Sequence, residues 1–178
     1  MQKIIVINEY KYSLKNILKD YNIKEIRIEK YGDLEKIINV DAEILVIILD
    51  IKNIEYFKLI NKKINPDIIF IPRIENICTK EKEFKLIKRI LKKIKNKILI
   101  INDNDKYLKN IFNNKLDIYR YGNNIYDDIE YIKDKNNLII KYQDKKYTIK
   151  NKESDIIGNI IIGLLFGIDL ENLIEKTS

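Results

Sequence analysis

The sequence has no histidine and one cysteine, Cys78. Without an imidazole, a chain cannot build a histidine-based catalytic triad, a histidine metal ligand or a histidine pH switch. A lone thiol cannot form an internal disulfide or a cysteine metal cluster, and it has no histidine to activate it as a nucleophile. Five glycines and two prolines are too few for collagen-like or linker-rich architecture. These absences exclude a large part of enzyme chemistry.

The composition is that of a globular protein. Hydrophobic residues make up 46% of the 178 residues and charged residues 34%, with a formal net charge of +7. This length predicts a single domain, 1–178, with a core of its own. A basic chain can bind nucleic acid, but lysine and glutamate are interspersed here, and the abundance of isoleucine, lysine, asparagine and tyrosine is typical of an AT-rich coding sequence. We therefore expect a solvated surface of mixed charge and no nucleic-acid partner.

The N-terminus does not read as a secretory signal, because the apolar run from Ile4 to Ile7 stops at Asn8 and Glu9. The most apolar stretch, 156–168, is too short and too interrupted by glycine and asparagine to span a bilayer. We expect a cytoplasmic protein that does not enter a membrane.

Short isoleucine and valine runs alternate with longer segments of helical period, which predicts parallel strands covered by helices. Strands are expected at about 3–8, 24–29, 43–49, 67–71 and 97–102, and helices at 12–21, 53–63 and 80–95. After Asn102 the pattern predicts a short helix at 104–112, strands at 116–120, 128–133, 137–142 and 145–150, and helices at 155–166 and 170–176. The fold class is three-layer α/β with a mainly parallel sheet flanked by helices. The expected parts are a parallel α/β part (1–113), a small antiparallel extension (114–153) and closing helices (154–178).

Ligands of an open parallel sheet bind beyond the carboxyl ends of its strands. A phosphate-binding loop there would need glycine after the first strand, and the segment from Asn8 to Ser13 contains none. Within it, Lys11 and Ser13 could be the remnant of a Lys-Ser/Thr pair. Asp103 and Asp105 follow the fifth strand, but two carboxylates without a third make a weak cation site, so helix capping is the simpler role for this segment.

Asp50 ends an apolar strand, as the phosphoacceptor of a receiver domain does. A receiver also needs an acidic pair after its first strand, where Glu9 supplies half, together with a Thr or Ser and a Lys that this sequence does not place. The favoured interpretation of Asp50 is a carboxylate that caps the following helix. A receiver-like signalling domain stays an alternative.

The order of segments resembles the central, ATP-binding domain of the Mur ligases and folylpolyglutamate synthetase, which join an amine to an acyl phosphate. The resemblance is carried by a Pro-Asp strand start, a lysine-bearing helix, an Asn-x-x-Asp segment, a Tyr-Gly pair and a Gly-Ile helix end. In this sequence they are Pro66-Asp67, the segment from Glu83 to Leu91, the segment from Asn102 to Asp105, Tyr121-Gly122 and Gly167-Ile168. The resemblance implies that Asn102 and Asp105 contact the nucleotide and that Lys88 is the lysine that family members carry carbamylated.

The departures from this pattern concern the chemistry. The glycine-rich loop is missing, and the magnesium-binding Glu of the third strand falls at Ile48. The family's Asp-His segment is absent, and the Asn before its closing helix falls at Asp155, or at Asn159 if a gap is allowed. Amide formation through an acyl phosphate needs a bound triphosphate and a metal. Without a metal to bridge, Lys88 reads as an ordinary surface lysine.

The leading hypothesis is a degenerate, non-catalytic relative of the Mur ligase central domain that works by binding a protein, either a full-length ligase or a copy of itself. We expect no cofactor, no metal and no catalytic residue. The alternative is an ATP-dependent amide ligase-like or nucleotide-binding protein with a diverged site, using ATP and magnesium with Lys11, Ser13, Asn102 and Asp105.

Overall fold

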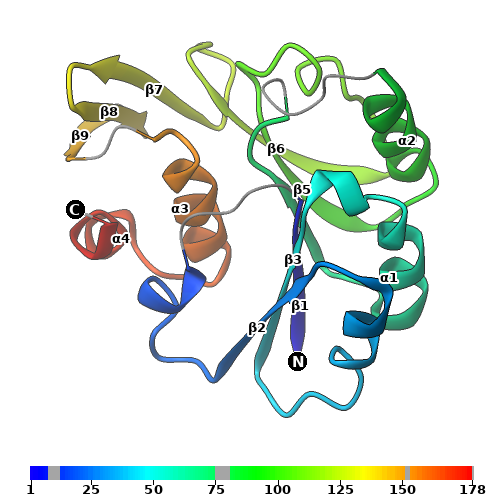
Figure 1. Cartoon of the computed structure of the whole chain (residues 1–178). Coiled ribbons are helices and arrows are strands. Elements are labelled where there is room, and N and C mark those ends of the chain that lie inside the picture. The colour runs from blue at the N-terminus through cyan, green and yellow to red at the C-terminus, as the bar shows by residue number, and fades with distance from the viewer. Residues whose placement is uncertain (8–12, 75–80, 151–152, 178) are drawn as a thin grey trace.

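The structure is a computed structural model that describes residues 1–7, 13–74, 81–150 and 153–177 (Figure 1). Its strands are β1 (Gln2–Ile7), β2 (Ile23–Ile28), β3 (Ile44–Leu49), β4 (Ile68–Ile71), β5 (Lys97–Asn102), β6 (Leu116–Gly122), β7 (Ile129–Asp134), β8 (Asn137–Tyr142) and β9 (Lys145–Ile149). Its α-helices are α1 (Tyr56–Ile64), α2 (Glu81–Leu91), α3 (Ile156–Leu165) and α4 (Leu170–Thr177). Short 3-10 helices are η1 (Leu14–Asn16), η2 (Tyr31–Glu35) and η3 (Ile51–Asn53).

The described strands form one sheet in the order β2-β3-β1-β4-β5-β6-β7-β8-β9. The strands from β2 to β6 are parallel, and β7–β8 and β8–β9 are antiparallel hairpins. The expected three-layer α/β fold with an antiparallel extension is therefore confirmed. Sheet order also separates this fold from a receiver domain, whose strands run 2-1-3-4-5, so the receiver-like alternative is wrong at the level of the fold.

The first strand of the expected antiparallel part, 114–153, is parallel to its neighbour in the sheet. β6 pairs parallel with β5 from Lys97↔Leu116 to Asn102↔Tyr121, and β7 begins parallel to β6. The connection 103–115 is long enough for the crossover that parallel neighbours require. Side-chain alternation within a strand does not encode its direction, so the sequence pattern could not reveal this pairing.

Each face of the sheet carries its own hydrophobic core, because successive strand residues point to opposite faces. Along β1, Ile5 and Ile7 join the core under α1 and α2, whereas Ile4 and Val6 join the core under α3 and α4. Figure 1 shows the two helix pairs on opposite sides of the sheet. The described residues contain no helix that is both long enough and apolar enough to cross a membrane.

The closing helices have the predicted ends. Gly167 follows α3 with a φ of +79°, and the N–H of Ile168 reaches back to the carbonyl of Gly163 at 3.1 Å. Asp169 precedes α4 and its Oδ1 accepts the N–H of Asn172 at 3.0 Å.

Two predicted helices are wrong. In the described part of 12–21, residues 13–21, the helical structure is limited to the 3-10 turn η1, which buries Leu14 before β2 starts at Ile23. In 104–112 it has successive turns, whose backbone groups are held by the side chains of Asp105 and Arg120.

The topological switch point lies at β1, where the sheet order turns from β3 on one side to β4 on the other. Residues 8–12, which follow β1, lie outside the described residues. So do residues 75–80 of the loop after β4. The carboxyl ends of β3, β5 and β6 and the first residues after β4 are described, and they form the edge at which a ligand site is expected.

Candidate functional site

Asp105 is the central polar residue at the carboxyl edge of the sheet. Its side chain is fully buried just beyond β5. Oδ2 accepts the N–H of Ile74, after β4, at 2.6 Å, and Oδ1 accepts the N–H groups of Tyr107 and Leu108 at 2.9 and 3.2 Å. One carboxylate therefore ties the loop after β4 to the turns after β5. Both of its oxygens are engaged within the chain.

Asn102, the last residue of β5, is also fully buried. Its Oδ1 accepts the N–H of Asn104 at 3.0 Å, which fixes the turn after β5; the expected helix capping is not seen, because no helix follows. Its Nδ2 has no acceptor among the described residues. A buried donor without an acceptor is uncommon and calls for a specific explanation.

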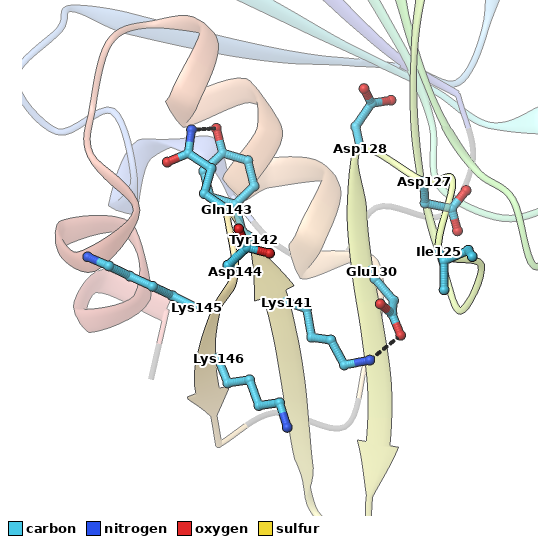
Figure 2. A pocket seen from close by; sticks show the side chains of 10 residues that line it. All are labelled: Ile125, Asp127, Asp128, Glu130, Lys141, Tyr142, Gln143, Asp144, Lys145 and Lys146. Carbon is cyan, nitrogen blue, oxygen red and sulfur yellow. Dashed lines mark hydrogen bonds and ion pairs between the residues drawn. The ribbon is translucent and has the colours of Figure 1, made fainter.

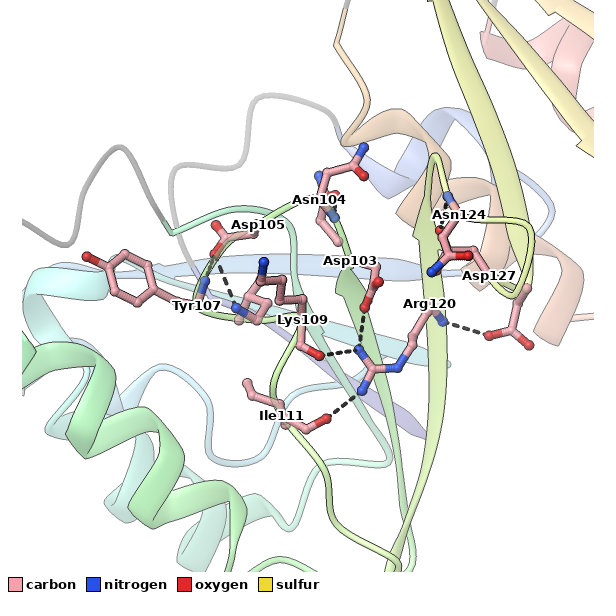
Figure 3. A network of polar contacts seen from close by, with 12 residues as sticks. Asp103, Asn104, Asp105, Tyr107, Lys109, Ile111, Arg120, Asn124 and Asp127 are labelled. Carbon is pink, nitrogen blue, oxygen red and sulfur yellow. Dashed lines mark hydrogen bonds and ion pairs between the residues drawn. The ribbon is translucent and has the colours of Figure 1, made fainter.

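A network of hydrogen bonds fixes the turns between β5 and β6 (Figure 3). The Arg120 guanidinium donates to Asp103 Oδ1 at 2.6 Å, to the carbonyl of Lys109 at 3.4 Å and to the carbonyl of Ile111. Asn104 Nδ2 donates to the Tyr131 hydroxyl at 2.9 Å, which links this edge to β7. Asp103 is therefore paired with Arg120, and the described residues contain no group of three or more Asp, Glu or Cys side chains that could hold a metal ion.

Gly122 and Asp127 close the same edge. A Cβ at Gly122 would lie 2.5 Å from Asp127 Oδ2 and 3.1 Å from Asn104 Oδ1, so a larger residue there would displace these two side chains. Partial burial and the nearby Asp103 carboxylate raise the pKa of Asp127 to about 6, although its Oδ2 accepts the Asn124 N–H at 3.0 Å. The pKa of the Asp127 carboxyl group therefore lies close to neutral pH.

The Tyr-Gly pair is a packing feature. The Tyr121 ring is fully buried between Phe70 and Tyr131, with ring centroids 6.4 Å from each, and its hydroxyl donates to the carbonyl of Pro72 at 3.2 Å. Burial raises the pKa of the Tyr121 phenol well above its ordinary value. Tyr121 thus holds the loop after β4 against β6.

The Pro-Asp motif lies at the opposite end of its strand. Asp67 Oδ2 accepts the N–H of Lys3 at 2.8 Å, and the Asp67 N–H donates to the carbonyl of Lys3 at 2.8 Å. Asp67 therefore sets the register of β4 against β1 and does not contribute to the carboxyl edge.

The other residues singled out in the sequence are scattered. Ser13 caps η1 and its hydroxyl donates to Glu25 Oε1 at 2.7 Å, on β2. Lys88 is exposed on α2, where its Nζ lies 5.9 Å from the ring centroid of Phe84. Lys11 lies outside the described residues, as do Glu9 and Cys78. The structure therefore brings together Asn102 and Asp105 but not Ser13 or Lys88.

Two positions at the carboxyl end of β3 have the roles that the sequence predicts. Asp50 caps η3, with Oδ1 accepting the Lys52 N–H at 3.0 Å and Oδ2 3.2 Å from Lys52 Nζ. Ile48, where the family's magnesium ligand would fall, packs into the core under α3 and α4 and is 7% exposed. An aliphatic side chain supplies no ligand atom, so this position does not fit a metal-bound nucleotide.

A second hollow, which sequence reasoning missed, lies on the antiparallel extension (Figure 2). It measures about 440 Å³ and is lined by β7, β8, the β8–β9 turn and the loop before β7. Its lining mixes both charge signs, and Lys141 Nζ pairs with Glu130 Oε1 at 2.6 Å. The charged residues that line the hollow are separated in the sequence and meet only because the strands pair. The sequence alone therefore could not indicate this hollow.

Two solved structures are similar to this chain over almost its whole length. MurF ligase from Thermotoga maritima in complex with ADP matches 97% of this chain and 48% of that chain, with a TM-score of 0.72 and 17% identity. UDP-N-acetylmuramate:L-alanyl-gamma-D-glutamyl-meso-diaminopimelate ligase from Neisseria meningitides matches 98% of this chain and 64% of that chain, with a TM-score of 0.59 and 6% identity. The present chain thus spans about half of the first ligase and less than two thirds of the second.

Neither the comparison with protein-family models nor that with curated proteins finds a match. At these identities, similarity to solved structures establishes the fold and not the activity. The chain has a Mur ligase-like central-domain fold, which the order of its sequence motifs predicts.

Proposed function

We propose that this chain is a non-catalytic relative of the Mur ligase central domain that works by binding another protein. The observation that carries the proposal is the state of Asp105. This residue stands where the resemblance expects a nucleotide contact, yet its buried carboxylate is occupied by three backbone N–H groups. A carboxylate committed in this way stabilises the edge and has little capacity left for a ligand.

The neighbouring positions support the same conclusion. Ser13 is held by Glu25, and Ile48 offers no metal ligand. Acyl-phosphate chemistry depends on a metal that gathers charge and on donors aimed at the phosphates. The described part of this edge supplies structural contacts where that chemistry would need free polar groups.

The loop between β6 and β7 supports a role in protein binding. Ile125 and Tyr126 are consecutive and 74% and 86% exposed. Their backbone is held by neighbours, because Asn124 Oδ1 accepts the Tyr126 N–H at 3.2 Å and Asp127 Oδ2 accepts the Asn124 N–H at 3.0 Å. An ordered loop that presents large apolar side chains loses little conformational entropy when a partner covers it.

Thermal denaturation with and without magnesium-ATP tests the non-catalytic part of the proposal. A ligand that binds the folded state raises the melting temperature. We expect magnesium-ATP to give the same melting temperature as magnesium alone, and no ATP hydrolysis. A rise of several degrees specific to ATP would contradict the proposal.

A second candidate function, residual nucleotide binding in a ligase-like enzyme, is favoured by the buried Nδ2 of Asn102. This donor is buried at the carboxyl end of β5 and has no acceptor among the described residues, so an acceptor on a bound nucleotide could satisfy it. The sequence also assigns Lys11, Ser13 and Asp105 to such a site, but Lys11 lies outside the described residues, and nucleotide binding would require Ser13 to leave Glu25 and Asp105 to release backbone N–H groups. Calorimetric titration of the wild type and Lys11→Ala with a non-hydrolysable ATP analogue separates the two candidates. Heat in the wild type that the variant lacks would support the second candidate, and no heat in either would reject it.

A further inference from the structure

The side chains of α1 and α2 line a groove. These two helices lie on the face of the sheet opposite α3 and α4 (Figure 1). The volume of the groove is about 680 Å³. Leu86 and Ile90 stand one helical turn apart on α2, and Ile94 lies on the turn that follows. Leu86 and Ile90 are only half-buried. The α2 side of the groove is therefore an apolar stripe that the described chain covers incompletely.

Cations flank this stripe on both helices. Lys58 and Lys62 are one turn apart on α1, and Arg89 and Lys93 have the same spacing on and just after α2. All four are exposed, and no ion pair joins them to a carboxylate in the described part of the chain. Among the described side chains that line the groove, Glu55 is the one acidic residue. The rim thus carries a clear excess of positive charge.

We propose that this groove binds an acidic amphipathic helix of a partner protein. The inference rests on the proposed protein-binding function and names the chemistry of the partner. A helix in a groove buries apolar residues at positions i, i+3, i+4 and i+7. Glutamate or aspartate one turn apart on either side of that stripe would face the paired cations of α1 and α2.

The groove favours a protein helix over nucleic acid. The apolar residues that line it are aliphatic, whereas proteins that hold single strands stack bases on aromatic side chains. Phosphates could meet the lysines, but they would leave the exposed parts of Leu86 and Ile90 without an apolar partner, whereas Ile94 is already buried in the core. An amphipathic helix satisfies both parts of the surface.

A second copy of this chain is a poor occupant. The acidic helix that a second copy could offer from its described residues is α4. It carries Glu171 and Glu175, with leucines beside them. Leu170 and Leu173 of α4 are buried in its own core, and Leu173 packs beside Gly163 of α3. α4 could enter the groove of another copy only by leaving that core, so α4 of a second copy is not the occupant.

Fluorescence anisotropy with labelled peptides tests the proposal on the full chain. The probes are helical peptides of about 16 residues, with leucine on one face and glutamate on both flanks, in several leucine registers. The comparison peptides carry lysine in place of glutamate. We expect the acidic peptides alone to bind, with an affinity that falls as salt is added.

The double variant Arg89→Glu/Lys93→Glu should weaken binding of the acidic peptide by about tenfold or more. The matched control, Lys133→Glu/Lys146→Glu, makes the same change in net charge on the exposed surface of β7 and β9, and should leave the affinity within about twofold. Circular dichroism spectra of all variants confirm that each is folded.

Three results would overturn the groove proposal: no binding of any acidic register, equal weakening by both double variants, or tighter binding of a thymidine oligonucleotide than of the acidic peptide. Failure here leaves protein binding through another face intact. Stabilisation by magnesium-ATP would instead reject the proposed function, whatever the peptides do.

Discussion

Replacing Asp105 with alanine should separate a structural carboxylate from a nucleotide ligand. The substitution removes both acceptor oxygens and leaves the N–H groups of Ile74, Tyr107 and Leu108 without their partner. A buried donor that loses its acceptor costs about 1 to 3 kcal/mol. Because water can enter the space of the lost carboxylate and satisfy part of the three donors, we expect the free energy of unfolding to fall by about 3 to 5 kcal/mol in total.

Asp105→Asn should be milder. The asparagine keeps one carbonyl oxygen for the N–H groups of Tyr107 and Leu108, but its amide NH₂ faces the N–H of Ile74. We expect the free energy of unfolding to fall by about 1 to 3 kcal/mol. Asp117→Ala, at an exposed position of β6, should change stability by less than about 0.5 kcal/mol.

Urea denaturation followed by circular dichroism at pH 7 measures all three variants. An Asp105→Ala variant within about 1 kcal/mol of the wild type would refute the structural role. A variant that kept its stability and lost a measurable affinity for ATP would assign Asp105 to the nucleotide instead.

Further predictions concern packing and pH. Gly158→Ala should lower the free energy of unfolding by about 1 to 3 kcal/mol, because the new Cβ would lie 2.1 Å from Cζ of the buried Phe70 ring. Gly32→Ala, with open space around it, should cost nothing, and equal effects in thermal denaturation would refute the packing argument. Asp127 has a folded-state pKa of about 6 against an ordinary 3.8, so its contribution weakens stability as pH rises through this window. Asp127→Asn should therefore be more stable than the wild type at pH 7, by about 1 kcal/mol after solvent screening, and urea titrations that show the same pH dependence for both would contradict this. Asp33 has a pKa lowered to about 2 by Lys36 and the N–H groups of residues 29 and 30, so its stabilisation is present above pH 3.8 and is lost as pH falls toward 2. Asp33→Asn should be less stable than the wild type at pH 7 and converge with it near pH 2, in the same titrations.

The strand positions were readable from the sequence because buried parallel strands are nearly continuous runs of isoleucine, valine and leucine. β3, from Ile44 to Leu49, is buried at every residue. The cap at Asp50 and the helix end at Gly167 were also readable, since each depends on a residue type at a local position. The helix expected at 104–112 failed because the side chains of Asp105 and Arg120 compete for its backbone groups.

The candidate site was predictable only in part. The sequence places Asn102 and Asp105 at the carboxyl edge of the sheet. It does not show which groups the carboxylates of Asp103 and Asp105 bind. Ile74 lies 31 residues from Asp105, and Arg120 lies 17 from Asp103. The α1–α2 groove depends in the same way on how two separate helices pack against one face of the sheet.

By itself, the sequence determined the fold class, the absence of histidine chemistry and the positions of the apolar strands, because composition and periodicity act locally. The tertiary structure decided the direction of β6, the engagement of Asp105 and the meeting of the two cationic helices. These features depend on contacts between residues far apart in the chain, and such contacts form only when the whole sheet assembles.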